Sequence, residues 1–404
     1  MSKQVFEGLK VADFSWAIVG PVIARYLGDH GATVVRVESA TRPDIVRASP
    51  PFKDKVAGIN RSAYYTNYNS SKYSLSLNMD LPQARDVARR LAVWSDVVIE
   101  SMAPGVIKGW GLGYDDLKAL KTDIIMMSTS NLGQTGPLAS MVGFGTQLVS
   151  QAGFTHLTGW PDREPAQPYA AYTDMLAPGF GTTALIGALE YRRRTGKGQY
   201  LDLSQLEGGL HFLASLFLDY QINGVEARRD GNRSTDAAPH GAYRCRGKDR
   251  WCAIAVDSEV AWQTFKHHIS TECPWVNDPR FATLQGRKAN EDELDKLVEA
   301  WTIEQIAEDV MVGLQAVSVA AGVVQNARDI LEDPQLSHRR HYRTLNHPEI
   351  GPHTYDYPPF HLSKTPAEIR NAPCLGEHNE FVIKELLGMS DEEYVELLVS
   401  GALE

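Results

Sequence analysis

With 404 residues, the chain is longer than one ordinary domain core requires, so two domains are favoured. Its hydrophobic content of 43% and charged content of 22% are those of a globular protein rather than of a disordered or fibrous one. The formal net charge of -10 provides no basic field for a nucleic-acid backbone, and we therefore expect no nucleic-acid partner.

The N-terminal segment and the cysteines bear on location and metal binding. Glu7, Lys10 and Asp13 interrupt the stretch in which a secretory signal would need apolar residues, and no segment is apolar over the length of a membrane span. The four cysteines match neither a CxxC pair nor a zinc ribbon, and no HExxH motif accompanies them. We expect a cytoplasmic protein that has reduced thiols and neither a metal site nor membrane association.

The N-terminal part alternates short apolar strands with helices. Strands are predicted at residues 9–14, 33–38, 97–100, 124–128 and 200–203. Gly20-Pro21 begins the first helix, directly after the first strand. This alternation predicts a large doubly wound, Rossmann-like parallel sheet whose strand-to-helix loops contact ligands. Because no GxGxxG motif follows the first strand, a dinucleotide cofactor is disfavoured.

The second half of the chain contains a change of domain. We assign residues 1–222 to the large domain and the polar stretch 223–236 to a linker. Residues 237–330, which begin with a hairpin pattern, are expected to form a small α/β domain. The proline-rich residues 331–404 are interpreted as a return segment that completes the large domain and ends in helices.

One carboxylate lies directly before a run of small and apolar residues. Asp174 precedes the helical pattern 181–194, and taken alone this position favours a helix N-cap. The positive end of a helix would also keep such a carboxylate ionised, as its ordinary pKa already does at neutral pH. The stretch by itself is therefore compatible with both a structural cap and a catalytic carboxylate.

Several separate motifs follow one another along nearly the whole chain. They are residues 9–14 with Gly20-Pro21, residues 31–38, Pro43-Asp44 with Arg47, Asn69-Ser70-Ser71-Lys72, Pro104-Gly105, Gly133-Gln134-Thr135-Gly136-Pro137, residues 195–199 and residues 372–378. Each motif is weak alone, but their order and spacing resemble the family III CoA-transferases, which include formyl-CoA, carnitine-CoA and benzylsuccinate CoA-transferases.

The resemblance implies a reaction and a nucleophile. The family's Asp-x-x-x-x-Gly stretch falls on Asp174 and Gly179, so Asp174 would attack an acyl-CoA thioester. An aspartyl anhydride and then an aspartyl-CoA thioester would follow, before a carboxylic acid accepts CoA. The resemblance implies CoA thioester substrates, no permanently bound cofactor, and an interlocked homodimer or a heteromer with a homologous subunit.

The family's CoA contacts carry over to four strand-to-helix loops. The corresponding residues are Ala17, Ile18, Val19, Ser39, Leu77, Asn78, Met79, Ser101, Met102, Ala103 and Lys108. Ser39 and Asp80 stand where relatives often carry basic residues. Arg36, Arg47 and Lys72 are therefore considered, together with Lys108, as alternative phosphate contacts.

Two other functions and the identity of the acids stay open. An α-methylacyl-CoA racemase resembles the same family, but Phe144 of Gly143-Phe144-Gly145 stands where its catalytic His would be and cannot act as a base. A CoA-ester-binding subunit of a heteromeric transferase is the second alternative. We expect succinyl-CoA as donor and an aromatic or dicarboxylic acceptor. Candidate acceptor contacts are Trp16, Trp160, Tyr172, Phe144, Arg47, Arg61 and His240.

Overall fold

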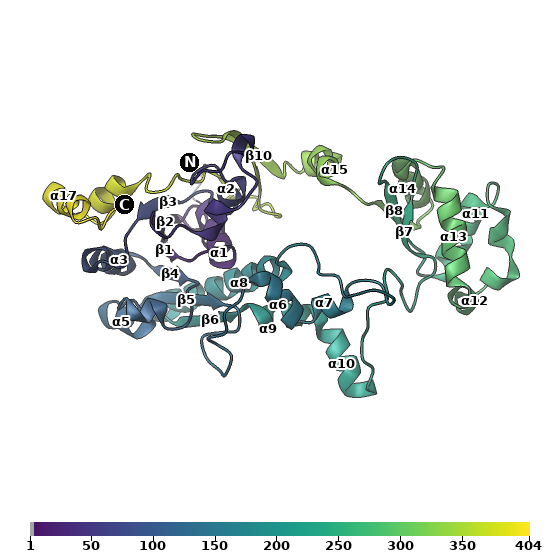
Figure 1. Ribbon diagram of the computed structural model, residues 1–404, viewed down its shortest axis with the longest axis horizontal. Coiled ribbons are helices and arrows are strands. Elements are labelled where there is room, and N and C mark those ends of the chain that lie inside the picture. Colours follow the sequence, from purple (N-terminus) through teal and green to yellow (C-terminus); the bar gives the residue numbers. More distant parts are fainter. Residues whose placement is uncertain (1–3) are drawn as a thin grey trace. The chain divides into compact units, whose positions relative to one another are not determined.

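The computed structural model describes residues 4–404 and divides into two compact units (Figure 1). Unit 1 comprises the described residues of Met1–His156 together with Ala166–Ala227 and Ser337–Glu404. Unit 2 comprises Leu157–Pro165 and Arg228–Leu336. Each unit contains its own sheet.

Unit 1 is built on a six-stranded sheet in which every neighbouring pair is parallel. In chain order its strands are β1 (Lys10–Phe14), β2 (Thr33–Glu38), β3 (Tyr73–Ser76), β4 (Val97–Glu100), β5 (Ile125–Ser130) and β6 (Tyr200–Ser204). The spatial order β3-β2-β1-β4-β5-β6 reverses direction at β1 and β4. This arrangement confirms the predicted doubly wound parallel sheet, whose ligand contacts lie at the carboxyl ends of the strands.

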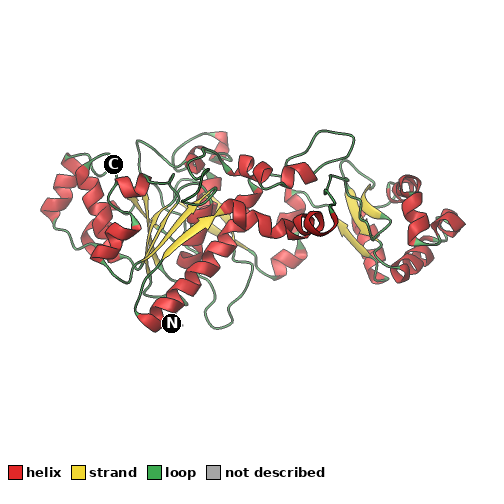
Figure 2. Ribbon diagram, turned by 90° about the horizontal axis from the view of Figure 1, so that it is seen from below, coloured by secondary structure: helices red, strands yellow, loops and turns green. Residues whose placement is uncertain are grey.

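Helices cover both faces of this sheet, as Figure 2 shows. Apolar residues of α3 (Pro82–Trp94) and α5 (Tyr114–Leu120) pack on one face, and those of α1 (Val19–Asp29) and α8 (Tyr172–Thr195) pack on the other. The shorter helices of the unit are α2 (Ala63–Tyr68), α4 (Val106–Gly109), α6 (Gly145–Gln151), α9 (Gln205–Leu210) and α10 (Ala214–Asn223); α7 (Phe154–Leu157) crosses the boundary between the units. None of the helices within residues 4–404 is long and apolar enough to cross a membrane.

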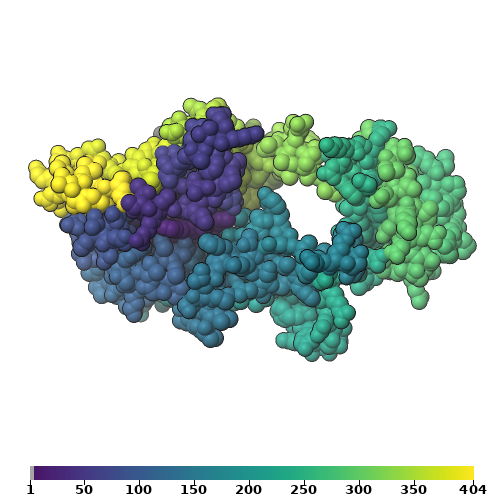
Figure 3. Space-filling model, viewed as in Figure 1, coloured from purple at the N-terminus to yellow at the C-terminus, as the bar shows by residue number. Residues whose placement is uncertain are grey.

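The C-terminal segment packs on unit 1 beside the N-terminal part of the chain (Figure 3). It contains an antiparallel hairpin of β10 (Tyr342–His347) and β11 (Gly351–Asp356), which the proline-rich sequence did not predict. A π-helical turn at Phe381–Leu386 and helix α17 (Asp391–Val399) follow. Arg25 of α1 pairs with Asp356 at 3.0 Å, which joins the hairpin to the first helix.

Unit 2 has a three-stranded antiparallel sheet in the order β7-β8-β9. The strands are β7 (His240–Arg244), β8 (Trp251–Ala255) and β9 (Ala320–Val323), and the first two form the hairpin that the sequence predicts. The helices are α11 (Glu259–Ile269), α12 (Leu284–Ala289), α13 (Glu291–Thr302), α14 (Ala307–Ala316) and α15 (Ala327–Glu332), while α16 (Pro334–His338) crosses the boundary to unit 1.

Candidate active site

Asp174 lies in the first turn of α8, and its side chain is not the N-cap that the sequence suggests. The helix begins at Tyr172 with Ala171 as the N-cap residue, and the Asp174 N–H donates to the Ala171 carbonyl at 2.9 Å. The helix continues through Pro178, whose missing N–H leaves the carbonyl of Asp174 without its helical donor. The residue is only 9% exposed, and its carboxylate is held by its place in the helix rather than by capping bonds.

The start of α6 lies directly against this carboxylate. A Cβ added at Gly145 would lie 2.4 Å from Asp174 Oδ1 and 2.5 Å from Ala171 Cβ, so the position accommodates only glycine without a shift. Asn131 Nδ2 donates to the Gly143 carbonyl at 2.9 Å, and the Phe144 N–H donates to Gln147 Oε1 at 2.9 Å. These bonds fix the loop that brings Gly145 against Asp174.

Burial controls the charge of Asp174. Desolvation raises the pKa of its carboxyl to about 7, because the ionised form loses water without gaining a cation. Among residues 4–404, no side chain forms a hydrogen bond or ion pair with this carboxylate. Burial therefore opposes the ionisation that the helix N-terminus was expected to favour at Asp174.

Aromatic side chains surround the first turn of α8. The charge of Asp174 contributes to raising the pKa of the Tyr64 hydroxyl, and the Tyr68 hydroxyl lies 4.0 Å from the sulfur of Met175. Tyr172 meets Phe154 edge to face with ring centroids 5.2 Å apart. An unpaired carboxylate in these surroundings is not stabilised by solvent or by a cation, and it is therefore suited to nucleophilic attack on a carbonyl.

A cavity of about 190 Å³ opens where β1, β2, β3 and β4 end. Five of the eleven residues predicted to contact CoA line it, namely Ser39, Leu77, Asn78, Met79 and Met102. Trp16, Trp110 and Phe14 provide aromatic walls. The structure thus brings three of the four predicted loops to one cavity.

The other predicted CoA-contact residues lie outside its lining. Ala17, Ile18 and Val19 connect β1 to α1, and Ser101 holds that connection because its hydroxyl accepts from the Trp16 N–H at 2.7 Å and lies 3.2 Å from the Trp16 carbonyl. Ala103 and Lys108 follow β4 and are exposed, and Lys108 belongs to α4, whose Val106 does line the cavity.

Three of the cations considered for phosphate binding are buried in ion pairs instead. Arg47 lies 2.7 Å from Glu38, and Lys72 lies 2.8 Å from Asp13. Arg36 pairs with Asp44 and lies 3.5 Å from Asp13. All their side chains are fully buried, so they are neither solvated surface charges nor phosphate ligands.

Sequence reasoning missed this network because the partners are carboxylates of other elements. Burial lowers the pKa of Lys72 to about 8 although Asp13 opposes the change, whereas the two nearby arginines hold the pKa of Glu38 down at about 2 despite its burial. Arg42 lines the cavity and pairs with Asp80 at 3.0 Å, and Lys108 is exposed in α4, whose Val106 lines the cavity.

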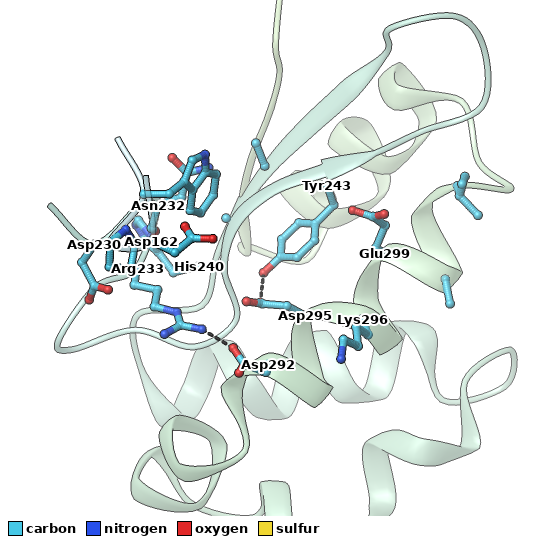
Figure 4. A pocket seen from close by; sticks show the side chains of 16 residues that line it. Asp162, Asp230, Asn232, Arg233, His240, Tyr243, Asp292, Asp295, Lys296 and Glu299 are labelled. Carbon is cyan, nitrogen blue, oxygen red and sulfur yellow. Dashed lines mark hydrogen bonds and ion pairs between the residues drawn. The ribbon is translucent and has the colours of Figure 1, made fainter. Parts of the chain in front are cut away.

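A second cavity, of about 750 Å³, lies within unit 2 (Figure 4). Five carboxylates line it, Asp162, Asp230, Asp292, Asp295 and Glu299, against the cations Arg233 and Lys296. Arg233 is paired with Asp292, and the Tyr243 hydroxyl donates to Asp295 at 2.7 Å. The lining is negative overall and is unfavourable for a carboxylic acid or a CoA phosphate.

The predicted acceptor contacts are spread over several places. His240 and Trp160 line the cavity of unit 2, and Trp16 lines the cavity of unit 1. Arg61 donates hydrogen bonds to Asp54 and to backbone carbonyls of its own loop. The guanidinium of Arg47 donates to Glu38 and Asn60. Phe144 is 62% exposed. Of the predicted aromatic contacts, only Tyr172 lies in the first turn of α8 beside Asp174.

Comparison with known proteins agrees with this architecture. The model of CoA-transferase family III matches residues 6–379. The succinyl-CoA–D-citramalate CoA-transferase of Chloroflexus aurantiacus is 30% identical over 388 residues, covering 96% of this chain and 95% of the relative. The succinyl-CoA:glutarate CoA-transferase of Mus musculus is 28% identical, covering 100% of this chain and 91% of the relative.

A crystal structure of a CaiB/BaiF family protein from Brucella suis superimposes with a TM-score of 0.86 at 30% identity, covering 95% of this chain and 100% of that chain. The family model, the relatives and the fold all agree with the resemblance seen in the sequence motifs. The chain therefore belongs to the CoA-transferase family III, and it is an enzyme that moves CoA between an acyl-CoA thioester and a carboxylate.

Proposed function

We propose that this enzyme transfers CoA from succinyl-CoA to a short dicarboxylic acid, with Asp174 as the nucleophile. The observation that carries the proposal is the Asp174 carboxylate, which is buried in the first turn of α8 against Gly145 and has no ion-pair partner among residues 4–404. The names of the two relatives support the choice of substrates, because both proteins use succinyl-CoA and both acceptors, D-citramalate and glutarate, are five-carbon dicarboxylic acids.

In the first half-reaction, an Asp174 oxygen attacks the thioester carbonyl of succinyl-CoA, and the C–S bond breaks to release CoA thiolate. The product is a mixed anhydride of succinate and Asp174. The thiolate then attacks the aspartyl carbonyl, which releases succinate and leaves CoA joined to Asp174 as a thioester. In each step an anionic nucleophile attacks a carbonyl and an anionic leaving group departs, a thiolate in the first step and a carboxylate in the second. Neither step therefore needs an external base.

The second half-reaction runs the same chemistry towards the acceptor. A carboxylate of the acceptor attacks the aspartyl thioester, and CoA thiolate leaves from a mixed anhydride of the acceptor and Asp174. The thiolate attacks the acceptor's carbonyl, which gives the new acyl-CoA and regenerates the Asp174 carboxylate. No proton is taken up or released over the cycle. The mechanism therefore requires only that the Asp174 carboxylate be ionised.

The cavity at the ends of β1 to β4 is the proposed site for the nucleotide end of CoA. Its walls combine the aromatic rings of Trp16 and Trp110 with the polar groups of Ser39 and Asn78, which suits a purine ring that needs both stacking and hydrogen bonds. Arg42 at its rim and the exposed Lys108 of the following loop are the proposed partners of the phosphates.

We also propose that the protein is a homodimer. Helix α10 buries none of its residues within the chain, and Phe217, Leu218, Tyr220 and Ile222 are 44%, 45%, 57% and 77% exposed. Continuous apolar surface of this kind usually marks an interface. A second copy of the chain is the proposed partner, and a homologous subunit is the alternative that an oligomeric-state measurement on the protein purified alone distinguishes.

The nucleophile is tested by trapping it. The protein is incubated with succinyl-CoA, quenched and digested, and the peptide that contains Asp174 is expected to carry the mass of CoA, which hydroxylamine should remove. Supplying glutarate or D-citramalate should discharge the label and produce the corresponding acyl-CoA. Asp174→Asn should carry no label and have no activity, whereas Asp115→Asn, at an exposed carboxylate of α5, should behave as the wild type. Turnover by Asp174→Asn would contradict the proposal.

A further inference from the structure

The loop that follows β2 holds a carboxylate from a distant part of the chain. The Glu404 side chain accepts from the Ser39 hydroxyl at 2.8 Å and from the Ala40 N–H at 2.5 Å. It also accepts from the hydroxyl and the N–H of Thr41, at 2.8 and 3.3 Å. Although burial opposes the change, these hydrogen bonds keep the pKa of the Glu404 carboxyl below its ordinary value. The loop of residues 39–41 therefore favours an anion.

The same loop forms part of the wall of the cavity at the ends of β1 to β4. Ser39 and Thr41 line this cavity of about 190 Å³, and so does the next residue, Arg42. The Arg42 N–H donates to the Ser39 hydroxyl at 3.2 Å, which places the arginine in the same turn. Its ion pair with Asp80 joins two mostly exposed side chains and is therefore weak. A ligand in the cavity thus meets an anion-binding loop that has a cation beside it.

Phosphate is the anion that these donors suit best. Converging backbone N–H groups and hydroxyls next to an arginine are typical of phosphate sites, because a phosphate group offers several strong acceptor oxygens. CoA, which the enzyme moves, carries a 3′-phosphate and a diphosphate at its nucleotide end. The two oxygens of the Glu404 carboxylate use the donors that such a phosphate would need. The carboxylate and a phosphate therefore cannot occupy the loop together.

The backbone that carries Glu404 is fixed, whereas its side chain is able to move. Residues 402–404 run beside the end of β3, where the Asn78 N–H donates to the Ala402 carbonyl at 3.0 Å and the Glu404 N–H donates to the Ser76 carbonyl at 3.4 Å. The Glu404 residue is only partly buried, and a glutamate side chain has several rotatable bonds. Its carboxylate can therefore leave the loop by a change of rotamer, without separation of residues 402–404 from β3.

We propose that loop 39–41 is a phosphate site for CoA and that the Glu404 carboxylate is its internal competitor, an autoinhibitory contact that leaves the loop when the phosphate enters. The inference rests on the proposed function of this cavity in binding the nucleotide end of CoA. The competition makes CoA affinity lower than the loop alone would provide. It therefore favours release of the product thioester at the end of each cycle.

Calorimetry of two variants tests the competition. Dissociation constants are measured for CoA, for 3′-dephospho-CoA and for pantetheine, which has no phosphate. Glu404→Ala should bind CoA about fivefold to tenfold more tightly than the wild type, because the phosphate no longer has to displace a hydrogen-bonded carboxylate. Glu404→Gln should show a smaller gain, since a neutral amide binds the same donors more weakly. A gain for CoA alone assigns the loop to the 3′-phosphate, and an equal gain for 3′-dephospho-CoA assigns it to the diphosphate.

A matched control and a measurement on the wild type separate competition from a structural contact. Glu396→Ala removes an exposed carboxylate of α17, in the same C-terminal segment, and should leave CoA affinity unchanged. In the wild type, carboxyl groups are labelled with a carbodiimide and glycine ethyl ester and are quantified by mass spectrometry. Labelling of Glu404 should increase when CoA is bound, because the displaced carboxylate enters solvent, whereas labelling of Glu396 should stay constant. A contact that only stabilises the fold would give no increase at Glu404.

Unchanged or weaker CoA binding by both Glu404 variants, or labelling of Glu404 that does not rise with CoA, would overturn the inference while leaving the proposed function intact. An equal gain in affinity for pantetheine would overturn it as well, since that ligand has no phosphate. Failure of the wild type to bind CoA or to form the Asp174 thioester would instead overturn the proposed function. The two failures are therefore distinguishable in the same set of measurements.

Discussion

At the scale of single residues, the most informative feature is the conflict between burial and charge at Asp174. Burial raises the pKa of this carboxyl to about 7 because no cation in the described part of the chain offsets the desolvation, whereas two arginines hold the pKa of the buried Glu38 at about 2. The two groups differ in their partners rather than in their depth. A carboxylate without partners is costly to bury, and such groups are typical of catalytic sites rather than of structural ones.

This raised pKa predicts a pH dependence of activity. If Asp174 is the nucleophile, as proposed, only its ionised form can attack the thioester, and kcat/KM should fall as pH decreases through about 7 with the slope of one proton. A steady-state pH profile measures this midpoint. Glu100, whose pKa burial also raises to about 7, is the necessary control. Glu100→Gln should retain the midpoint, and a wild-type midpoint below about pH 5 would contradict the assignment.

The same shift predicts that Asp174, the proposed nucleophile, destabilises the fold. Raising the pKa of Asp174 from its ordinary value to about 7 corresponds to about 4 kcal/mol, since each pKa unit is worth ~1.36 kcal/mol. The cost is absent below the unfolded pKa, grows as pH rises towards 7 and is complete above it. Asp174→Asn should therefore unfold at a higher temperature than the wild type at about pH 8, and this advantage should vanish near about pH 4. Thermal melts at both pH values measure it.

At the scale of elements, the contact between α6 and α8 defines the geometry of the site. A side chain at Gly145 would overlap Asp174 Oδ1, so Gly145→Ala must displace either the carboxylate or the start of α6. We expect activity to fall about 100-fold, the usual result of misplacing a reacting group by ~1 Å. Gly187→Ala is the matched control, because a Cβ at that position of α8 meets nothing within 4 Å. Equal activities of the two variants would show that the contact is unimportant.

Elements that depend on residues close together in the sequence could be predicted, whereas those that depend on distant residues could not. Five of the six strands of the parallel sheet are runs that alternate with helices along the chain, which is local information, whereas β3, the Tyr-Ser-Leu-Ser run of Tyr73–Ser76, was not predicted. Helix α8 begins at Tyr172, earlier than the helical pattern at residues 181–194, and it contains Pro178. The hairpin β10–β11 was hidden by Pro352, which a two-stranded ribbon tolerates at its edge.

Those parts of the candidate site that lie in recognisable sequence motifs could be predicted. Asp174 and five of the lining residues of the smaller cavity follow from positions that match a family pattern. The burial of Arg36, Arg47 and Lys72 could not be predicted, because their carboxylate partners are side chains of other elements that meet them only in the folded sheet. The steric role of Gly145 was missed for the same reason, since its neighbour is 29 residues away and on another helix.

At the scale of the whole molecule, the apolar surface of α10 predicts the oligomeric state. The protein should sediment as a dimer when it is expressed alone, because the exposed apolar side chains of Tyr220 and Ile222 on one helix are typical of an interface. Replacing both by Glu should produce monomers in analytical ultracentrifugation, as like charges would be buried across the interface. Val260→Glu, at an equally exposed position of unit 2, is the control and should leave the sedimentation coefficient unchanged. A monomeric wild type would contradict the prediction.

The division of unit 1 into separated segments also determines the order in which the protein can form. Unit 2 is fully synthesised at Leu336, whereas unit 1 still needs Ser337–Glu404, which provides the Asp356 partner of Arg25 and the Leu403 bridge to Leu77. At the usual ~5–20 residues per second, the last 68 residues take roughly 3–14 s to emerge. During that interval the ribosome carries a complete unit 2 and a unit 1 whose six parallel strands are present but whose C-terminal segment is still missing, so this is the period in which the nascent chain most needs a chaperone.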